Sequence, residues 1–171
     1  LAVSLDGSTA EIHDDFRQLP GAYDKTLMAI GWANEVGLPI QVHTTASRHN
    51  ISDLDRLATL LRELDIVMWS VFFLVPVGRG QKADLLPGGE FEQVFEKLYQ
   101  LSKEVPFQVK TTEAMHYRRY ILQQHVAELE QGKLTQSAAT PSQGRTGQWV
   151  TRRVNDGRGF VFVSHVGNVY P

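Results

Sequence analysis

Two patterns of hydrophobic and polar residues alternate four times along the chain. Segments such as 67–75 are apolar almost throughout, which predicts strands of a parallel sheet that is covered on both faces. Other segments repeat an apolar residue every three or four positions, as at Leu54, Leu57 and Leu61, which predicts amphipathic helices. The predicted strands are 1–5, 38–45, 67–75 and 107–112, and the predicted helices are 23–36, 52–64, 91–105 and 115–131.

Individual residues set the expected ends of these elements. Gly37 follows the first helix at the position where glycine commonly ends a helix, and Ser52 is expected to cap the second helix. Residues 6–21 and the Gly- and Pro-rich residues 76–89 are expected to form loops.

The alternation of strand and helix predicts an α/β fold with a parallel sheet and right-handed crossovers. A closed barrel of eight units takes about 250 residues. A partial (β/α) barrel of about four parallel βα units therefore fits the chain better. We assign residues 1–131 to this barrel, the polar residues 132–157 to a linker or flexible loop, and 158–171 to a β-hairpin that begins an extension.

Polar side chains follow each predicted strand, at the end where folds of this kind carry their chemistry. Hydroxyls and several cations stand there, so the edge is suited to a polar, partly anionic ligand such as a carboxylate or a phosphate. Ordinary structural roles stay open for the same residues. Ser4 and Asp6 are common turn formers, Thr44 is a good strand residue, and Asn50 stands near the start of a helix.

Composition narrows the function classes. A net charge of -2 and a pI of about 6.3 give no electrostatic footprint for nucleic acid or an anionic membrane. No apolar run approaches the ~20 residues needed to span a bilayer, and no signal peptide is visible, so a cytoplasmic location is expected. With 0 Cys, these residues can form no disulfide and supply no thiolate to a metal. Phosphate-loop, nucleophile-elbow and H-E-x-x-H motifs are absent as well.

The ordered motifs resemble the radical S-adenosylmethionine (SAM) superfamily, in particular haem-pathway and peptide-maturation members with a C-terminal SPASM or twitch extension. Residues 3–7 resemble the family's fourth strand, and 13–17 with 21–24 resemble its "HD-x-x-R … G-x-(F/Y)-D" loop. Residues 37–50 and 69–80 resemble the fifth and sixth strands with their loops, and 159–171 resemble the hairpin that enters a SPASM-type domain. The resemblance covers nearly the whole chain.

This resemblance implies a longer parent protein with SAM and a 4Fe–4S cluster as cofactors. In that parent, an oxidoreductase, reductive cleavage of SAM would start radical chemistry on a small molecule or peptide. The family's Cys-x-x-x-Cys-x-x-Cys loop and the SPASM cysteines have no counterpart here. We therefore expect a fragment that retains neither cofactor and is inactive alone.

The resemblance also assigns roles to the residues at the strand ends. Arg48 is the expected ligand of the SAM carboxylate, because a guanidinium binds a carboxylate through two hydrogen bonds. The full cofactor-binding set is Ser4, Asp6, Thr44, Ser47, Arg48 and Asn50 for the methionine and ribose parts, and Pro76 and Gly78 beside the adenine. The substrate-side set is Lys110, Glu113, His116 and Arg119. No residue is assigned to catalysis or to a metal.

Two other functions stay open. A metal-dependent (β/α)-barrel hydrolase or isomerase would use His13, Asp14, His43 and His116, and it requires these side chains to converge. A non-catalytic ligand-binding module predicts a complete native chain that begins near Leu1. A truncated parallel sheet exposes its first strand as an edge, so we expect the fragment to self-associate through that edge.

Overall fold

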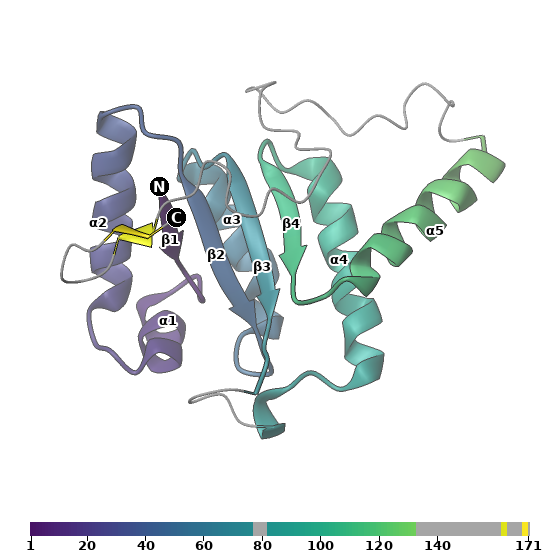
Figure 1. The fold of residues 1–171 in the computed structure, drawn as a ribbon, viewed down its shortest axis with the longest axis horizontal. Coiled ribbons are helices and arrows are strands. Elements are labelled where there is room, and N and C mark those ends of the chain that lie inside the picture. Colours follow the sequence, from purple (N-terminus) through teal and green to yellow (C-terminus); the bar gives the residue numbers. More distant parts are fainter. Residues whose placement is uncertain (77–81, 133–161, 164–168, 171) are drawn as a thin grey trace. The chain divides into compact units, whose positions relative to one another are not determined.

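The computed structural model describes residues 1–76, 82–132, 162–163 and 169–170. The chain divides into two compact units, Leu1–Pro141 and Ser142–Pro171, which are described separately. The first unit holds four strands in one sheet, in the order β1-β2-β3-β4 (Figure 1). The strands are β1 (Ala2–Ser4), β2 (Gln41–Ala46), β3 (Met68–Phe73) and β4 (Gln108–Thr112). The helices are α1 (Ala10–Arg17), α2 (Ala22–Glu35), α3 (Leu54–Glu63), α4 (Gly88–Glu104) and α5 (His116–Glu130), with short 3₁₀ turns η1 (Ile51–Asp53) and η2 (Lys82–Asp84).

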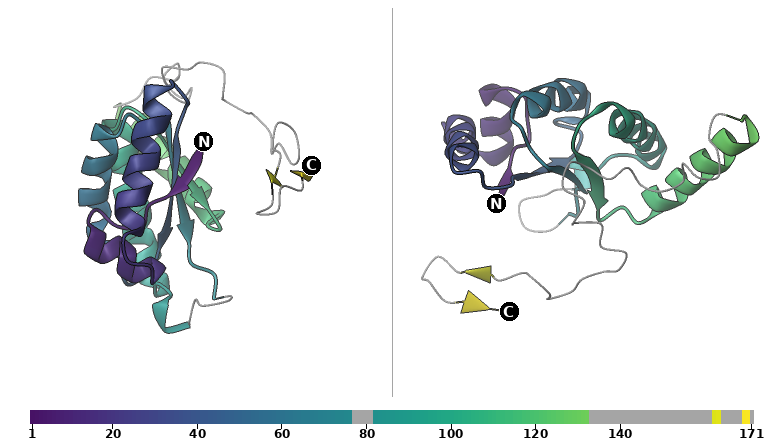
Figure 2. Two further views of the ribbon diagram at one scale, coloured as in Figure 1. Left: turned by 90° about the vertical axis from the view of Figure 1, so that its left-hand side faces the viewer. Right: turned by 90° about the horizontal axis from the view of Figure 1, so that it is seen from above.

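All neighbouring strands of this sheet run parallel, and helices connect them. This confirms the predicted α/β fold with four parallel strands, the arrangement of a partial barrel. Figure 2 shows α1 to α4 together on one side of the sheet. The core forms there, where Trp69 and Val71 of β3 pack among Leu57 and Leu61 of α3 and Phe95 of α4, all at most 1% exposed. Burying each such side chain stabilises the fold by about 1.5–3 kcal/mol.

The register of the strands separates an apolar face from a polar one. Val3, Val42 and Trp69 are paired across β1, β2 and β3, and their side chains belong to the helix-covered core. One position further along, the paired residues are Ser4, His43, Ser70 and Lys110. Because successive side chains of a strand point to opposite faces, this second row lies on the face opposite α1 to α4, which no helix covers among the described residues and which we call the helix-free face. Parallel sheets are usually apolar on both faces, so the polar row requires a separate explanation.

The expectation of a loop over residues 6–21 is wrong, because α1 lies within that segment. Only Ile12 and Phe16 give α1 an apolar spacing, so the helix lacks the long repeat on which the prediction depended. The features that define this helix lie at its two ends. The Thr9 hydroxyl accepts a hydrogen bond from the Ile12 amide, and Gln18 adopts the left-handed conformation that terminates many helices.

Strand β2 begins at Gln41, three positions after its expected start, and two helix starts also differ from expectation. Residues 51–53 form the 3₁₀ turn η1, and α3 begins only at Leu54 with Asp53 as its N-cap residue, so Ser52 is not the cap. Helix α4 begins at Gly88, three positions before the expected start, and η2 shortens the loop that precedes it. Both differences arise at helix starts, where short turns precede the apolar repeat.

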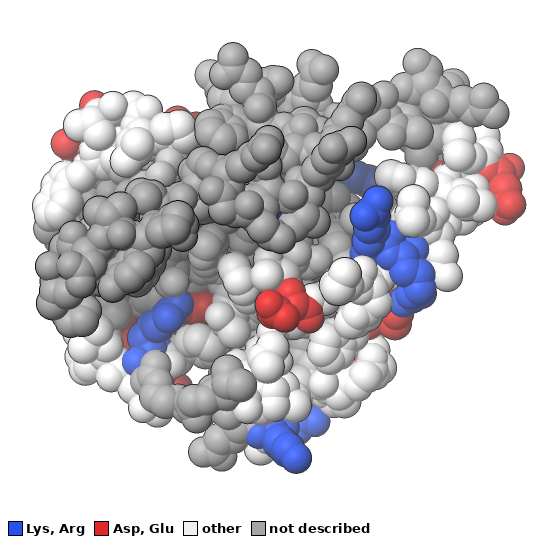
Figure 3. All heavy atoms as spheres, in the orientation of Figure 1, with Lys and Arg blue, Asp and Glu red and all other residues white. Residues whose placement is uncertain are grey.

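In the second unit, the described residues form one antiparallel strand pair. Phe162–Val163 (β5) pairs with Val169–Tyr170 (β6), which confirms the hairpin predicted there. The predicted linker 132–157 lies outside the described residues except for Gly132. Among the described residues, no helix is long and apolar enough to cross a membrane. The described atoms in Figure 3 show basic and acidic side chains in small separate groups rather than one continuous basic patch.

Strand β1 has a free edge among the described residues, and we expect the 171-residue chain to self-associate there. Leu1 and Leu5 bond to β2, so the backbone N–H and C=O groups of Ala2 and Ser4 point to the open edge. Light scattering at high protein concentration should detect a dimer or larger assembly. Ala2→Pro removes one outward N–H without touching the β1–β2 ladder, and it should weaken the assembly. A wild-type chain that stays monomeric at high concentration would contradict the prediction.

Candidate functional site

Asp6 joins β1, β2 and α1 at the C-terminal edge of the sheet. Its side chain is 0% exposed, and its Oδ1 accepts a hydrogen bond of 2.7 Å from the Thr45 amide. Its Oδ2 lies 2.5 Å from a terminal nitrogen of Arg17, and its own amide donates to His13 Nδ1 over 3.0 Å. Burial raises the pKa of Asp6, and the Thr45 amide and the Arg17 guanidinium act against that rise. Asp6 is therefore committed to contacts inside the protein.

Asn50 connects the loop after β2 to the ends of β1 and β2. Its Nδ2 donates to the carbonyl oxygens of Asp6 and Thr45, both at 2.9 Å. Its Oδ1 accepts from the Ser47 amide at 3.0 Å. Asn50 is 1% exposed and Ser47 is 0% exposed, so both side chains shape the loop from within.

Thr44 links the edge to the helix-covered core. Its hydroxyl donates to the carbonyl oxygen of Leu5 over 2.7 Å and accepts from the indole nitrogen of Trp69 over 2.9 Å. Thr44 is 0% exposed on the face that the helices cover. The structure thus gives Asp6, Thr44 and Asn50 the structural roles left open by the sequence, and their contact with SAM stays a prediction.

His13 and Arg17 of α1 contact Asp6 and so hold the end of β1. Asp14 on the same helix orients α2. Asp14 accepts hydrogen bonds from the amides of Gly21 at 2.6 Å and Tyr23 at 2.8 Å, which lowers its pKa. The Tyr23 hydroxyl in turn donates to the carbonyl of Ser8. The residues of the "HD-x-x-R … G-x-(F/Y)-D" stretch therefore hold the end of β1 in place. His13 and Arg17 were missing from the predicted site set, although this motif already pointed to them.

Only some of the predicted site residues at this edge have side chains that remain accessible to a ligand. Ser4 is half-buried at the end of β1, whereas Arg48 and Pro76 are exposed. The Arg48 amide donates to the carbonyl of Asp84, which positions the loop, and its guanidinium forms no ion pair in the described part of the chain. Gly78 lies outside the described residues. Arg48 is thus the cation at this edge that is available to an anionic ligand.

The four substrate-side residues have separate surroundings. Lys110 lies on the helix-free face of β4, and Glu113 follows that strand with a left-handed backbone (φ 61°). The ring of His116 packs against Phe91 and Phe95 at centroid distances of 5.5 and 4.8 Å. Arg119 forms an ion pair with Glu92 on α4 and a hydrogen bond with Gln123. Arg119 is therefore engaged in the packing of α5 on α4.

The residues of the metal-barrel hypothesis do not form one cluster. His13 accepts a backbone hydrogen bond, Asp14 caps α2, and His43 lies on the helix-free face of the sheet. Among the described residues, no group of three or more His, Asp and Glu side chains is placed to hold a metal ion. The geometry gives this hypothesis no support.

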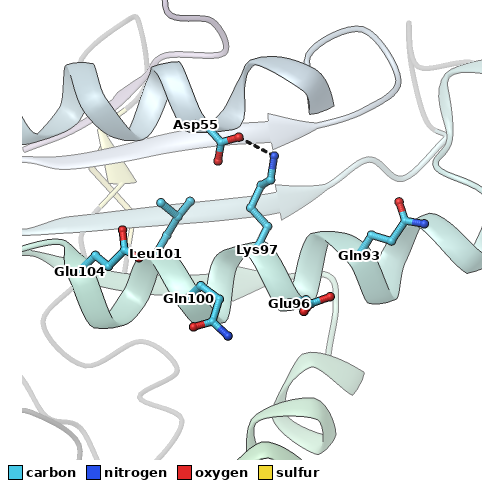
Figure 4. Close-up of a pocket in the computed structure, with 7 residues that line it drawn as sticks. All are labelled: Asp55, Gln93, Glu96, Lys97, Gln100, Leu101 and Glu104. Atoms are coloured by element: carbon cyan, nitrogen blue, oxygen red, sulfur yellow. Dashed lines mark hydrogen bonds and ion pairs between the residues drawn. The ribbon is translucent and has the colours of Figure 1, made fainter.

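A surface depression between α3 and α4 is lined mainly by polar and charged side chains (Figure 4). An ion pair between Asp55 and Lys97, 2.7 Å apart, bridges the two helices across it. This depression lies on the helix side of the sheet, and we assign it no function. The lining residues are Asp55, Gln93, Glu96, Lys97, Gln100, Leu101 and Glu104.

Known proteins similar to this chain point to one family. No family model matches the chain. The AdoMet-dependent heme synthase of Methanosarcina barkeri is 38% identical over 172 aligned residues, which cover 100% of this chain and 47% of that protein. The AdoMet-dependent heme synthase of Nitratidesulfovibrio vulgaris is 33% identical, with 99% of this chain and 45% of that protein covered. The Fe-coproporphyrin III synthase of Methanosarcina barkeri is 34% identical over 82 residues, which are 48% of this chain and 20% of that protein.

The fold also matches solved structures. Streptococcus suis SuiB superposes with a TM-score of 0.55 at 17% identity, over 70% of this chain and 28% of SuiB. SuiB bound to its precursor peptide SuiA gives a TM-score of 0.57 at 15% identity, over 71% of this chain and 28% of SuiB. Identities this low establish a shared fold and nothing more.

The class that these findings define is the radical SAM proteins. Over its whole length the chain is homologous to the members named AdoMet-dependent heme synthase, and the expected family is confirmed. The chain spans about half the length of these relatives.

Removing the charge of Arg17 should destabilise the 171-residue chain at neutral pH. Arg17→Met leaves the buried Asp6 carboxylate without its counter-ion, which typically costs 3–5 kcal/mol for a buried pair. Because the Arg17 side chain is 33% exposed, we expect about 2–3 kcal/mol in urea unfolding at pH 7. The double variant Arg17→Met/Asp6→Asn removes both charges and should recover most of the loss. Arg56→Met, on the exposed side of α3, is the matched control, and equal losses in both single variants would contradict the prediction.

Histidine titration should make stability depend on pH. Burial lowers the pKa of His13 below its usual 6.5, and the charge of Arg17 lowers it further. In the neutral form, His13 Nδ1 accepts a hydrogen bond from the Asp6 amide, which protonation of that nitrogen would break. Its stabilising contribution is therefore full above about pH 6.5 and is lost as pH falls through the folded pKa. His43, whose pKa is also lowered by burial, contributes in the same direction. Asn at position 13 keeps an acceptor but cannot titrate, so His13→Asn should flatten the decline in unfolding free energy below pH 6.5. An unchanged slope would contradict this.

Proposed function

We propose that this chain is the SAM-binding part of a radical SAM oxidoreductase. The observation that carries the proposal is the 33–38% identity with AdoMet-dependent heme synthases, which extends over the whole chain. When bound, SAM and the cluster supply reductive cleavage of SAM, which starts radical chemistry on the substrate. The role of this chain is to bind and orient SAM and to shape the face against which the substrate lies.

The residues at the sheet edge fit SAM in chemical type. Arg48 offers an exposed guanidinium for the carboxylate of SAM, with a planar geometry suited to two parallel hydrogen bonds. Ser4 offers a half-buried hydroxyl group for the methionine or ribose part, and residues 76–78 are assigned to the adenine. The Ser47 hydroxyl is buried and bonds within its own loop, so Ser47 takes part by shaping that loop. Asp6, Thr44 and Asn50 take part by holding β1, β2 and the following loop in register.

The chain does not fit a 4Fe–4S cluster. It contains 0 Cys, so it has no thiolate ligand to offer. The proposal therefore assigns cluster binding to residues of a longer protein and gives the 171-residue chain no activity of its own.

For the substrate, we propose an iron porphyrin that the enzyme converts to a haem-type product. Three relatives that match 99–100% of the chain are named heme synthases. A peptide substrate is the second candidate, since one SuiB structure contains a precursor peptide. The much lower identity of SuiB, 15–17%, makes the porphyrin the stronger candidate.

The proposal is tested on the whole protein, purified without oxygen. We expect bound iron and release of 5′-deoxyadenosine from SAM under reducing conditions. Arg48→Met should weaken SAM binding at least ~10-fold in equilibrium dialysis, because a hydrogen bond to a charged group is lost. Arg56→Met removes an exposed guanidinium from α3 and serves as the matched control.

Two results would contradict parts of this proposal. Protein that holds no iron and leaves SAM intact would reject the radical SAM activity. Equal SAM affinities in the Arg48→Met and Arg56→Met proteins would reject the role of Arg48 while leaving the activity in place.

A further inference from the structure

The helix-free face of the sheet carries a row of polar side chains, of which only Ser4 is also assigned to SAM. Ser4, His43, Ser70 and Lys110 are register partners across all four strands, and they lie side by side. In Figure 1 this face is seen in front of α3 and α4, and in Figure 2 it is the side opposite the helices. His43 stands three residues before the end of β2 and Lys110 two residues before the end of β4, so both lie roughly 7–10 Å along the strands from the C-terminal edge, whereas Ser4 is the last residue of β1.

Contacts with Gln41 and Phe72 orient the ring of His43. Gln41 Nε2 lies 2.7 Å from His43 Nε2 and 3.0 Å from the hydroxyl of Ser70. If the amide donates both hydrogens, His43 Nε2 is the acceptor and the ring carries its proton on Nδ1. The ring is also held by Phe72, at a centroid distance of 5.0 Å. We assign this tautomer, in which His43 presents Nδ1–H as a donor, and Nδ1 forms no hydrogen bond within the described residues.

Lys110 supplies a positive charge on the same face. Its side chain is exposed and forms no ion pair among the described residues. Burial lowers the pKa of His43, and the charge of Lys110 lowers it further, so the imidazole is held neutral beside the ammonium group. One cation, one neutral N–H donor and the Ser4 hydroxyl face the same open side.

We propose that Lys110 and His43 bind a carboxylate group of the substrate on the helix-free face. This inference rests on the proposed radical SAM function and extends it to the substrate side of the sheet. Strands β2 and β4 lie two strand spacings apart, about 10 Å, so a carboxylate fits between the ends of the two side chains. One oxygen accepts from the Lys110 ammonium group and the other from His43 Nδ1–H. Ser70 is 1% exposed and acts through Gln41, as a positioning residue.

The donor set selects this ligand over others. A divalent metal is disfavoured because an ammonium group cannot coordinate it and repels it. An apolar ligand would leave the polar row without hydrogen-bond partners, which is costly when water is displaced. The carboxylate of SAM itself is assigned to Arg48 at the edge, which is separated from this row along the strands.

The test is a binding titration on the whole protein with two iron porphyrins. The probes are Fe-coproporphyrin III, a tetracarboxylate, and its tetramethyl ester, and binding is followed by porphyrin absorbance without reductant. Wild type should bind the acid more tightly than the ester. Lys110→Met should weaken binding of the acid at least ~10-fold and leave binding of the ester unchanged, since only the acid loses a charged partner. His43→Gln should reduce the preference for the acid by a smaller factor.

Controls separate a binding role from a structural one. Lys110→Arg keeps the charge and should retain most of the affinity for the acid, whereas Lys25→Met removes an exposed lysine from α2 and should change nothing. The dissociation constant of SAM should stay within about twofold of wild type in every variant, because Arg48 holds that ligand. A loss confined to melting temperature, a shift in SAM affinity instead, or a wild type without preference for the acid would each overturn the proposal. Release of 5′-deoxyadenosine by wild type is measured in parallel, so failure of the radical SAM function is seen separately.

Discussion

The buried carboxylate of Asp6 is the constraint on which the functional edge depends. A charge removed from water is costly, and here it is compensated by the Thr45 amide of β2 and the Arg17 guanidinium of α1. Each of these partners comes from a different part of the chain. The carboxylate therefore couples the end of β1 to β2 and α1 at once. The loop that carries Arg48 inherits its position from this coupling through Asn50.

The two faces of the sheet differ in polarity and in what covers them. One face packs Trp69, Val71 and their neighbours against the helices and supplies most of the burial that stabilises the fold. The other face carries the row of Ser4, His43, Ser70 and Lys110 and receives no helix in the described part of the chain. A parallel sheet with one polar face is suited to a ligand on that face, since water or a ligand must satisfy the polar groups. The proposed binding of SAM at the edge and of the substrate on the polar face would place two neighbouring binding surfaces on one sheet.

The haem-related relatives are more similar to this chain in sequence than the SuiB structures are. Identity of 33–38% extends over 99–100% of the chain, whereas the SuiB structures share the architecture at 15–17%. The parallel sheet of βα units is a scaffold that serves many reactions, so substrate choice has to come from side chains on the edge and on the polar face. In our proposal, Lys110 and His43 are the residues on that face that distinguish an anionic substrate from a neutral one.

The sequence by itself determined the order of the elements, the parallel α/β class, the hairpin and the family. Apolar periodicity and ordered motifs are local signals, and they survive without knowledge of contacts. It did not reveal α1, in which Ile12 and Phe16 give too short an apolar repeat.

Only the tertiary structure decided which polar residues form hydrogen bonds inside the protein. Asp6, Thr44 and Asn50 look like ligand residues by type, but their partners come from up to 44 positions away along the chain. Burial and long-range hydrogen bonds therefore separate the residues that hold the edge from Arg48, Lys110 and His43, which remain available to ligands.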